Sequence, residues 1–384
     1  MRTVLGLDRI GEYDRLFTGK RIGLITNYSG VDSSWNLNID LFLKKGYQLV
    51  KLFTPEHGLF GSGAGEAVAN AAFPGSNIPI ISLFGEKDKQ RPSKEELEGI
   101  DLLIYDIQDV GLRYYTYIYT MTYCMEAAAE LGIQFIVLDR PNPLGNRIIA
   151  GGVIEPDCAS FIGDYGLPMR YGMTPGEVGN YFIAYRNLSL DYMVIKLKEY
   201  GRDMLFPQTR QPWNVPSPAL PDFTCTICYS GGCAVGASNI SEGRGTPHPF
   251  LTYGAPYIDM EEFYEALLPW VDREKLLIRK KAFTPSERKY IGEICYGIEL
   301  MPLCDTYDFI PLSMRILKAA ADLYPNDFEL VKAADGQMHI SRVTGSHEME
   351  RVLEGKKDLD SLLTEWDAQS KVFAEATEQY RIYR

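Results

Sequence analysis

The chain has 384 residues, 46% of them hydrophobic, and a formal net charge of -12 at pH 7. This length and apolar content are sufficient for a sizeable core and predict two domains rather than one. The acidic balance argues against a general binder of nucleic-acid backbones, because such proteins carry a basic surface that displaces counterions. There is no run of about 18 apolar residues, so we expect no transmembrane helix. The opening stretch MRTVLGLDRI lacks the apolar core of a signal peptide. This predicts a cytoplasmic protein as written, or a periplasmic or cell-envelope protein if a leader has been removed.

The first half of the chain alternates short apolar runs with helical patterns. The runs lack polar alternation, as expected for strands covered by helices on both faces, and span 21–27, 47–55, 78–85, 101–108, 134–140 and 191–197. Helical patterns lie between several of them, at 33–45, 93–99, 116–131 and 174–187. This alternation predicts an α/β fold with a mostly parallel sheet, right-handed crossovers and helices on both faces.

The second half has a different pattern. The stretch 201–250 is irregular and rich in proline and glycine, which is typical of functional loops or of a crossing between domains. Beyond residue 256 the pattern predicts an α+β segment, with helices near 260–269, 311–323 and 358–380 and strands near 276–283 and 293–300. We therefore predict an α/β domain over 1–205, cleft loops and a crossing segment over 206–255, and a smaller α+β domain over 256–384.

Polar side chains follow several of the predicted strands at the point where each strand ends. They are Asn27 after the first strand, Glu56 and His57 after the second, Asp106, Gln108 and Asp109 after the fourth, and Asp139, Arg140 and Asn142 after the fifth. In a parallel sheet these ends meet at one edge, where the ligand crevice lies. Any one of these residues could instead cap a helix or make a turn, but their recurrence favours a functional site.

Several familiar chemistries have no support in the sequence. The seven cysteines are an odd number spread over a long chain, which does not indicate a disulfide framework. Cys225 and Cys228 form a C-x-x-C, but no second pair follows at zinc-ligand spacing. We interpret them as two small residues in a loop and predict no metal site. No phosphate-binding glycine motif, nucleophile elbow or H-E-x-x-H is present.

The remaining polar chemistry consists of carboxylates, aromatic side chains and arginines. The segment QDVGLRYYTYIYT at 108–120 places Arg113 among tyrosines that include Tyr115, and SEGRGT at 241–246 holds Glu242 and Arg244 between glycines. Aromatic faces stack on the C–H faces of sugars, and arginine binds carboxylates bidentately. The alternative is that the tyrosines pack the start of the following helix. Carboxylates with clustered aromatics indicate a glycosidase-type pocket.

Several longer segments resemble the motifs of a known family, in the same order and at similar spacing. They are GLITNYSG, LFTPEHGLFG, DIQDVGLRYYTY, VLDRPNPLGN, YGMTPGEVGNY, PWNVPSPALP, SEGRGTPHPF and YGAPYID. The chain is therefore similar, over nearly its whole length, to the DUF1343 family of exo-β-N-acetylmuramidases called NamZ. The resemblance implies a Rossmann-like N-terminal domain, a smaller C-terminal domain and a cleft near their interface. It also implies release of N-acetylmuramic acid from the non-reducing end of peptidoglycan fragments, without metal or nucleotide.

The resemblance also implies residue roles. Glu56, in the P-E-H-G segment, would be the catalytic carboxylate that protonates the leaving oxygen. For the second catalytic group, Asp109, Glu66, Glu242 and the substrate's own acetamido group stay open. Arg113, Arg140 or Arg244 would pair with the lactyl carboxylate of muramic acid. The full set of candidate substrate-binding residues is Asn27, His57, Glu66, Asp106, Gln108, Arg113, Tyr115, Asp139, Arg140, Asn142, Asn239 and Arg244. The expected partners are peptidoglycan-derived saccharides or muropeptides, not nucleic acid.

The chain departs from the family pattern at three positions. Ala219 stands in PSPA where members have P-S-P-N, Gly236 in GASN where they have E-G-T-N, and Tyr171 where a histidine precedes G-M-T. A site built around a hydrogen bond loses discrimination when the partner is missing. The changes therefore predict slower cleavage or a different terminal sugar than in relatives. They also leave open that the protein is a relative of these enzymes that binds muropeptides or other carbohydrates without cleaving them.

Overall fold

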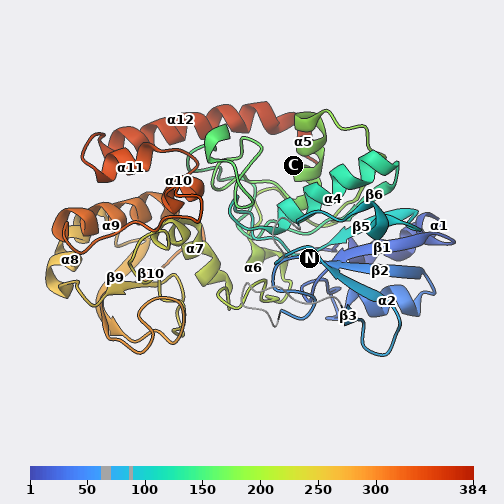
Figure 1. Cartoon of the computed structure of the whole chain (residues 1–384), viewed down its shortest axis with the longest axis horizontal. Coiled ribbons are helices and arrows are strands. Elements are labelled where there is room, and N and C mark those ends of the chain that lie inside the picture. Colours follow the sequence, from blue (N-terminus) through green and yellow to red (C-terminus); the bar gives the residue numbers. More distant parts are fainter. Residues whose placement is uncertain (62–70, 86–89) are drawn as a thin grey trace.

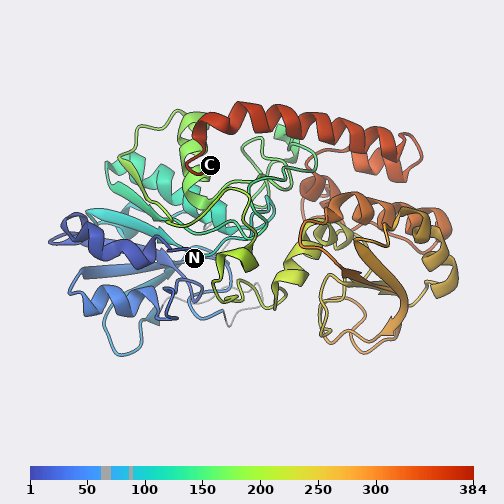
Figure 2. The ribbon, with the colours of Figure 1, turned by 180° about the vertical axis from the view of Figure 1, so that it is seen from behind.

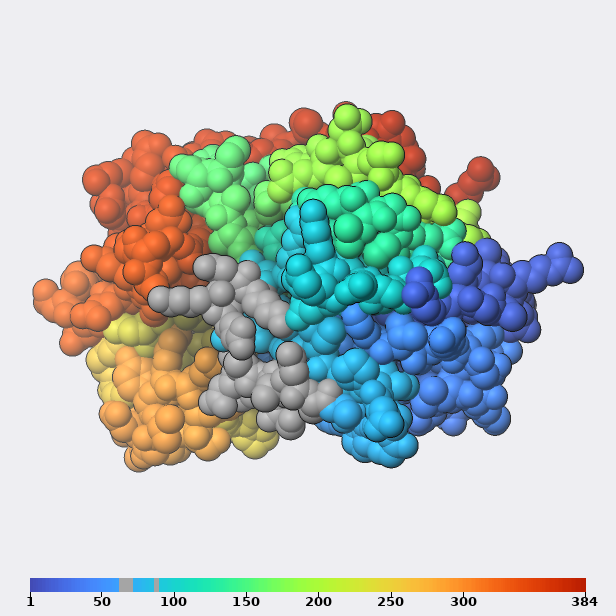
Figure 3. All heavy atoms as spheres, turned by 45° about the vertical axis from the view of Figure 1, so that its right-hand side comes forward, coloured from blue at the N-terminus to red at the C-terminus, as the bar shows by residue number. Residues whose placement is uncertain are grey.

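The computed structural model describes residues 1–61, 71–85 and 90–384 (Figure 1). Within these ranges the chain forms one large and one small sheet, each with its own helices. The sheets lie at opposite ends of an elongated molecule (Figure 1, Figure 2). Figure 3 shows the same arrangement at the surface, with the N-terminal part in blue and cyan on the right and the small-sheet part in yellow and orange at the lower left.

The large sheet has seven strands in the order β3-β4-β2-β1-β5-β6-β7. Its strands are β1 (Arg21–Thr26), β2 (Gln48–Thr54), β3 (Ala71–Ala72), β4 (Pro79–Ser82), β5 (Leu102–Asp106), β6 (Gln134–Leu138) and β7 (Tyr192–Ile195). All neighbouring pairs are parallel except β3 with β4. The predicted α/β fold with a mostly parallel sheet is confirmed. Each apolar run predicted in the first half contains one strand, and β3 is an addition.

Helices cover both faces of this sheet. Successive side chains of a strand point to opposite faces, so an apolar strand has to be covered on both. Leu103 and Tyr105 of β5 pack in the core that contains α4 and α5, whereas Leu102 and Ile104 pack in the opposite core with α1 and α2. The helices and 3-10 turns are η1 (Leu7–Tyr13), α1 (Asp14–Phe17), α2 (Asn38–Lys44), α3 (Lys94–Leu97), α4 (Tyr117–Leu131), η2 (Pro156–Cys158) and α5 (Pro175–Arg186). Helix α2 is shorter than the predicted 33–45, because the Asp32 carboxylate accepts backbone hydrogen bonds that hold a turn before it.

The parallel arrangement brings several strand ends to one edge of the sheet. The register pairs Thr26 at the end of β1 with Asp106 at the end of β5. Glu56 follows β2 on one side of β1, and Asp139 follows β6 on the other side of β5. The sequence therefore places these residues at the correct edge, but their exposure is decided by what packs over them.

The middle of the chain is more regular than the sequence predicts. It contains α6 (Phe206–Thr209) and α7 (Phe223–Val235) within the stretch predicted as loops. Helix α7 begins after Asp222, whose carboxylate accepts a hydrogen bond from the Cys225 amide at 2.7 Å. The helix is buried on most sides and packs against α9 (Phe309–Leu323), so its sequence has no polar face to reveal a helical period. Cys225 and Cys228 are buried in this helix, and their placement in a loop was wrong.

The small sheet is antiparallel, in the order β8-β10-β9. Its strands are β8 (Thr252–Ala255), β9 (Leu276–Phe283) and β10 (Cys295–Pro302). Around it lie α8 (Met260–Leu267), η3 (Leu268–Trp270), α9, α10 (His339–Thr344) and α11 (Glu348–Leu353). The predicted smaller part with its own sheet is confirmed. Helices α10 and α11 are additions, because six residues are too few to show a helical period.

The C-terminal segment returns from the small-sheet part to the large sheet. It consists of α12 (Leu359–Thr377) and η4 (Glu378–Tyr380), and it ends beside α5 (Figure 1, Figure 2). The Tyr383 hydroxyl donates to Asp139 Oδ2 at 2.6 Å, and Glu177 of α5 accepts a hydrogen bond from the Ile382 amide at 2.7 Å. The end of the chain thus covers polar groups at the edge of the large sheet. The domain limits 1–205, 206–255 and 256–384 stay a prediction.

Helix α12 has 19 residues and carries acidic side chains along its length. Neither it nor any other helix in the described ranges is long and apolar enough to span a bilayer.

Candidate active site

Glu56 lies in a tight turn directly after β2. The strand is buried at its end, and the turn is closed by a hydrogen bond from the Gly58 amide to the Pro55 carbonyl at 3.1 Å. His57 has a φ of 72°, a left-handed conformation that non-glycine residues rarely adopt and that often marks functional sites. Gly58 follows with a φ of 68°. This backbone reverses the chain within P-E-H-G and leaves the Glu56 side chain half-buried beyond the sheet.

One oxygen of Glu56 is held by the start of α4. The Thr116 hydroxyl donates to Glu56 Oε2 at 2.8 Å, and Thr116 is the N-cap residue of this 15-residue helix. The N-terminal end of a helix carries a partial positive charge, which favours a carboxylate nearby. Glu56 therefore has a defined orientation.

A cavity of about 280 Å³ borders Glu56. One wall comes from the large-sheet part, at 56–57 and 114–116, and the other comes from α7 and from loops that include 217–220 and 287–288. The volume is close to the lower end of the range of about 300–1,000 Å³ that is usual for ligand pockets. A cavity of this size suits one or two small rings rather than a long polymer.

Aromatic side chains form much of the cavity wall. Tyr114, Tyr115 and Tyr229 border it, and the Tyr229 ring lies 5.4 Å from Tyr114 and 6.4 Å from Tyr115 between centroids. The Tyr115 hydroxyl donates to the Pro216 carbonyl at 2.7 Å, which fixes the ring against the opposite loop. Phe250 also borders the cavity, and its ring lies 4.8 Å from Tyr229 between centroids. These rings present flat apolar faces of the kind that sugar rings cover.

The opposite wall is basic. Arg244, Arg288 and His339 border the cavity. Arg244 Nε donates to Glu242 Oε1, and Lys289 Nζ donates to Glu242 Oε2 at 3.0 Å. Burial alone would raise the pKa of Glu242, but Lys289 and Arg244 outweigh it and hold that pKa below its ordinary value. Glu242 therefore stays ionised and serves to hold the two cations.

Arg288 and His339 differ from Arg244 in their side-chain contacts and charge. Within the described part of the chain, no hydrogen bond or ion pair holds the Arg288 guanidinium, and its φ is 69°. Burial, together with the cations Arg342, Lys289 and Arg244, lowers the pKa of His339. His339 is therefore expected to be neutral at pH 7, so the positive charge at the cavity comes from the arginines.

The structure brings some of the predicted residues together at this cavity and adds others. Glu56, His57, Tyr115 and Arg244 border it, and their roles stay predictions. Sequence reasoning did not include Thr116, Tyr229, Arg288 or His339 as site residues. Tyr229 was missed because the segment that forms α7 was predicted as a loop. Arg288 and His339 lie in segments with no motif that could have indicated them. Glu66 lies outside the described residues.

The expectation that one cleft contains all the polar strand ends was wrong. Asp106 is fully buried and pairs with Arg140, whose Nε lies 2.6 Å from Asp106 Oδ1. Asn38 donates to the other Asp106 oxygen at 2.7 Å. Arg140 also donates to the Val31 carbonyl at 3.0 Å. These groups satisfy one another inside the protein, and breaking such a buried pair leaves an uncompensated charge.

Asp139, Asn142 and Asn27 also have structural partners. Asp139 accepts hydrogen bonds from Thr174 and Tyr383, and burial raises its pKa to about 7. Asn142 donates to the Met173 carbonyl at 3.1 Å and accepts from the Leu144 amide. The side-chain oxygen Oδ1 of Asn27 accepts hydrogen bonds from the amide and the hydroxyl of Ser29. None of the three borders the cavity next to Glu56.

Arg113 and Gln108 are likewise bound to backbone carbonyls. Arg113 is completely buried and donates to the carbonyls of Gly152, Leu167 and Val343 at 2.6–2.7 Å. Burial lowers the pKa of Arg113 to about 10. Gln108 donates to the carbonyls of Asp109 and Pro141. The side chains of Gln108 and Arg140 border a separate cavity of about 20 Å³, which is room for about one water molecule. Arg113 and Arg140 are therefore not available to a substrate carboxylate in this structure.

Asn239 is not among the residues that border the cavity. Its side chain donates to the Asp327 carbonyl at 2.7 Å and accepts from the Tyr257 hydroxyl at 2.8 Å. It also accepts from the Glu329 amide. Asn239 therefore fastens the 327–329 loop and does not border the cavity.

Asp109 is buried and does not border the cavity. Its Oδ2 accepts hydrogen bonds from the Gly111 amide at 2.6 Å and from the Tyr171 hydroxyl. Burial raises the pKa of Asp109 to about 6, although both hydrogen bonds favour the ionised form. The departure at Tyr171 thus concerns a buried contact, and the role of Asp109 as the second catalytic group loses its geometric support.

We expect Asp109→Asn to leave kcat within a few-fold of wild type and to change the pH dependence of stability. Asparagine can accept the same two hydrogen bonds without a charge. Because the folded-state pKa of Asp109 is raised, its stabilising contribution is full below about pH 4 and is lost as the pH rises through about 6. Relative to wild type, the variant should therefore gain about 2–3 kcal/mol between pH 4 and pH 7, since one pKa unit is worth about 1.4 kcal/mol. Urea unfolding at both pH values measures this, and a parallel pH profile for the two proteins would contradict it.

Comparison with known proteins places this geometry in a family. The family model for the N-terminal part of exo-β-N-acetylmuramidase NamZ matches residues 22–224, and the model for its C-terminal part matches residues 227–383. The chain belongs to the NamZ family. It is 38% identical, over 98% of its length and 91% of the relative's, to the peptidoglycan β-N-acetylmuramidase NamZ of Bacillus subtilis.

Solved structures of DUF1343 family proteins have the same fold. One DUF1343 family protein from Bacteroides fragilis superposes with a TM-score of 0.91 at 29% identity, over 100% of this chain and 99% of that one. A second DUF1343 protein from the same organism has a TM-score of 0.75 at 25% identity, over the same shares. The predicted family and fold are confirmed.

The three departures from the NamZ motifs lie at different places. Ala219 borders the cavity, where it offers a methyl group in place of an amide. Gly236 lies beside the basic wall, since a side chain there would begin 3.5 Å from an Arg244 nitrogen. Its carbonyl accepts a hydrogen bond from Lys289 at 2.9 Å. Tyr171 is buried against Asp109, away from the cavity. Ala219 and Gly236 are thus the departures that can alter how a sugar is held.

Proposed function

We propose that this protein is an exo-acting glycoside hydrolase that releases N-acetylmuramic acid, or a related amino sugar, from the non-reducing end of peptidoglycan fragments. The observation that supports this best is the Glu56 carboxylate, fixed by Thr116 at the border of an aromatic cavity with arginines on its far wall. The relative from Bacillus subtilis is named a peptidoglycan β-N-acetylmuramidase, and this chain matches it over nearly its whole length.

Glu56 is the general acid in the proposed mechanism. It donates its proton to the glycosidic oxygen as the bond to the anomeric carbon breaks, so that the rest of the glycan leaves as an alcohol. Water then adds to the anomeric carbon and loses a proton. Among the described residues, the cavity is bordered by only one other carboxylate, the exposed Glu287. Glu242 is held by two cations and Asp109 is buried, so Glu66 and the substrate's acetamido oxygen are the alternatives for the second group that the structure leaves open.

The cavity accounts for exo-action through its size. At about 280 Å³ it accepts a terminal sugar, whereas an endo-acting enzyme needs a groove that continues past the cleaved bond on both sides. The tyrosines of the cavity wall would bind the ring faces, and the basic wall would bind an anionic substituent. The lactyl carboxylate of muramic acid is the group that distinguishes this sugar from N-acetylglucosamine.

Arg288→Gln is expected to weaken binding of N-acetylmuramides by about 10–100-fold, because a hydrogen bond to a charged group contributes about 1.5–3 kcal/mol. The effect should appear in KM with little change in kcat if the contact is equal in the ground and transition states. The same variant should treat N-acetylglucosaminides as wild type does, because they lack the carboxylate. Arg273→Gln, at an exposed position away from the cavity, is the matched control. Equal losses on both substrates would remove Arg288 from lactyl recognition.

A panel of para-nitrophenyl β-glycosides tests the proposed function. N-acetylmuramide should be cleaved, N-acetylglucosaminide more slowly, and neutral hexosides not measurably. Efficient cleavage of a neutral hexoside would contradict the arginine–carboxylate part of the proposal. No cleavage of any substrate, together with calorimetric binding of muropeptides, would instead identify a carbohydrate-binding relative in which Ala219 and Gly236 have removed turnover.

The proposed substrate also bears on where the protein acts. Peptidoglycan fragments occur in the cell envelope and, during wall recycling, in the cytoplasm. A location in one of these two compartments is part of the proposal.

A further inference from the structure

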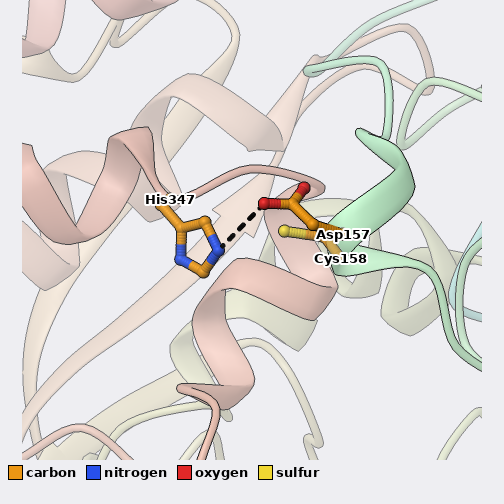
Figure 4. Close-up of side chains that lie close together, drawn as sticks. All are labelled: Asp157, Cys158 and His347. Atoms are coloured by element: carbon orange, nitrogen blue, oxygen red, sulfur yellow. Dashed lines mark ion pairs between the residues drawn. The ribbon is translucent and has the colours of Figure 1, made fainter.

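A second group of side chains with metal-binding chemistry lies outside the cavity (Figure 4). Asp157, Cys158 and His347 each direct one potential ligand atom to a common point, and these atoms lie within 4.8 Å of one another. Asp157 and Cys158 end η2, and His347 directly precedes α11. The catalytic proposal uses none of the three.

Glu350 orients His347 in the way that a metal ligand requires. The Nδ1 atom of His347 lies 2.9 Å from Glu350 Oε1, and its Nε2 faces Asp157 Oδ2 at 3.6 Å, which Figure 4 marks with a dashed line. Histidines that bind metals commonly have their second nitrogen held by a carboxylate in this manner, which fixes the tautomer and the ring direction. Nε2 is therefore the nitrogen presented to the carboxylate and the thiol.

The charges and the exposure of this cluster also suit a cation. The carboxylates of Glu155, Asp157 and Glu350 are the acidic groups that act on it, and Arg113 is the opposing cation. The Arg113 guanidinium is directed to backbone carbonyls, as described above. Cys158 is buried, whereas Asp157 is exposed and His347 is half-buried, so an ion can enter from solvent on the Asp157 side.

We propose that Asp157, Cys158 and His347 bind one Zn²⁺, with water as the fourth ligand. A thiolate, an imidazole and a carboxylate form a donor set that Zn²⁺ accepts, whereas Mg²⁺ and Ca²⁺ favour oxygen ligands alone. Binding converts the Cys158 thiol to a thiolate and releases its proton to solvent. Bringing the ligand atoms to bond lengths requires the exposed Asp157 and the half-buried His347 to move toward the buried Cys158.

The metal would brace the contact between the two halves of the molecule. Near the cluster, the Glu155 amide donates to the Gly345 carbonyl at 2.7 Å, and Gln337 donates to the Asp157 carbonyl at 3.2 Å. Helix α10, which lies between Gln337 and Gly345, begins with His339 at the cavity wall. Zn²⁺ bound to residues of both segments would therefore hold this wall in place without taking part in the chemistry.

Co²⁺ and Zn²⁺ titration of the full chain, after treatment with a chelator, tests the proposal. Co²⁺ should bind with a stoichiometry of one and produce the near-ultraviolet band of a cobalt–thiolate bond, and Zn²⁺ should displace it. Zn²⁺ should also raise the Tm in proportion to the logarithm of its free concentration, because it binds the folded state. These readouts do not depend on activity, so they stand whether or not the proposed glycosidase function is correct.

Variants locate the ion. Cys158→Ala should abolish the cobalt–thiolate band, and His347→Gln should weaken Zn²⁺ binding by about 100-fold or more. Glu350→Gln, which keeps an acceptor for the Ser341 hydroxyl but removes the carboxylate that orients His347, should weaken it by about 10–100-fold. Cys304→Ala and His248→Gln are the matched controls, because neither residue belongs to the cluster. Cys304 is half-buried, and His248 pairs with Glu299.

Either of two results would overturn the proposal. One is the absence of Zn²⁺ binding to the wild-type protein. The other is binding that His347→Gln leaves unchanged, which would assign the ion to a different place. His347 is half-buried, so its variant is expected to fold even if Cys158→Ala does not.

Discussion

Glu56→Gln is expected to lower kcat by about 100-fold or more, because general acid–base catalysis typically contributes about 10²–10⁴-fold. Glutamine has the shape of glutamate and can still accept the hydrogen bond that Thr116 donates at 2.8 Å, but it cannot supply a proton to the leaving oxygen. Substrate binding should change little. Single-turnover cleavage of para-nitrophenyl N-acetylmuramide measures the chemical step separately from product release.

Two controls make this result specific. Glu287→Gln removes the other carboxylate that borders the described cavity, and it should cost at most a few-fold in kcat. Thermal unfolding of Glu56→Gln should match wild type, since Glu56 is half-buried and keeps its partner. If the Glu56 variant retains near-normal turnover, or if the Glu287 variant is the inactive one, Glu56 is not the acid.

Glu242→Gln is expected to destabilise the protein by about 3–5 kcal/mol, because removing one member of a buried ion group leaves the others uncompensated. Glu242 is buried and holds both Arg244 and Lys289, so glutamine there would leave two cations facing one another. The same change should release Arg244 from its orientation at the cavity and raise KM for N-acetylmuramides. Urea unfolding and steady-state kinetics measure the two effects.

The pH dependence of this loss has a defined sign. The folded-state pKa of Glu242 is lowered, so its contribution is full above the ordinary glutamate pKa of about 4.3 and is lost as the pH falls further. Glu299→Gln is the matched control, because Glu299 is also buried in a cluster of cations but its partner Arg279 is largely exposed. That variant should lose about 1 kcal/mol or less and keep a normal KM. A Glu242 variant as stable as the Glu299 variant would contradict the role assigned to the buried ion group.

The positions of the strands along the chain and the position of Glu56 at the edge of the sheet could be predicted because both are encoded locally. An apolar run that ends in Pro-Glu-His-Gly signals a buried strand followed by a turn, and parallel strands present such ends at one edge. His57 adopts a left-handed conformation, which completes the turn. Tyr115 and Arg244 could be predicted for a similar reason, since each lies in a short segment rich in one kind of chemistry.

The polar residues at the other strand ends could not be assigned correctly, because their partners are remote in sequence. Asp139 is satisfied by Tyr383, which lies 244 residues away, and Arg113 is satisfied in part by the Val343 carbonyl, 230 residues away. Nothing local distinguishes a carboxylate that faces a cavity from one that a C-terminal tail covers. The opposite error affected Arg288 and His339, which reach the cavity from loops without a motif.

Digestion of a defined, linear peptidoglycan oligosaccharide with N-acetylmuramic acid at its non-reducing end tests the central proposal most directly. The products should be read by mass spectrometry as a function of time. We expect free N-acetylmuramic acid and a glycan one residue shorter as the first products, with no early internal fragments and a slower reaction when the terminal sugar is N-acetylglucosamine. Early internal fragments, or an unchanged oligosaccharide after prolonged incubation with the folded protein, would contradict an exo-acting muramidase.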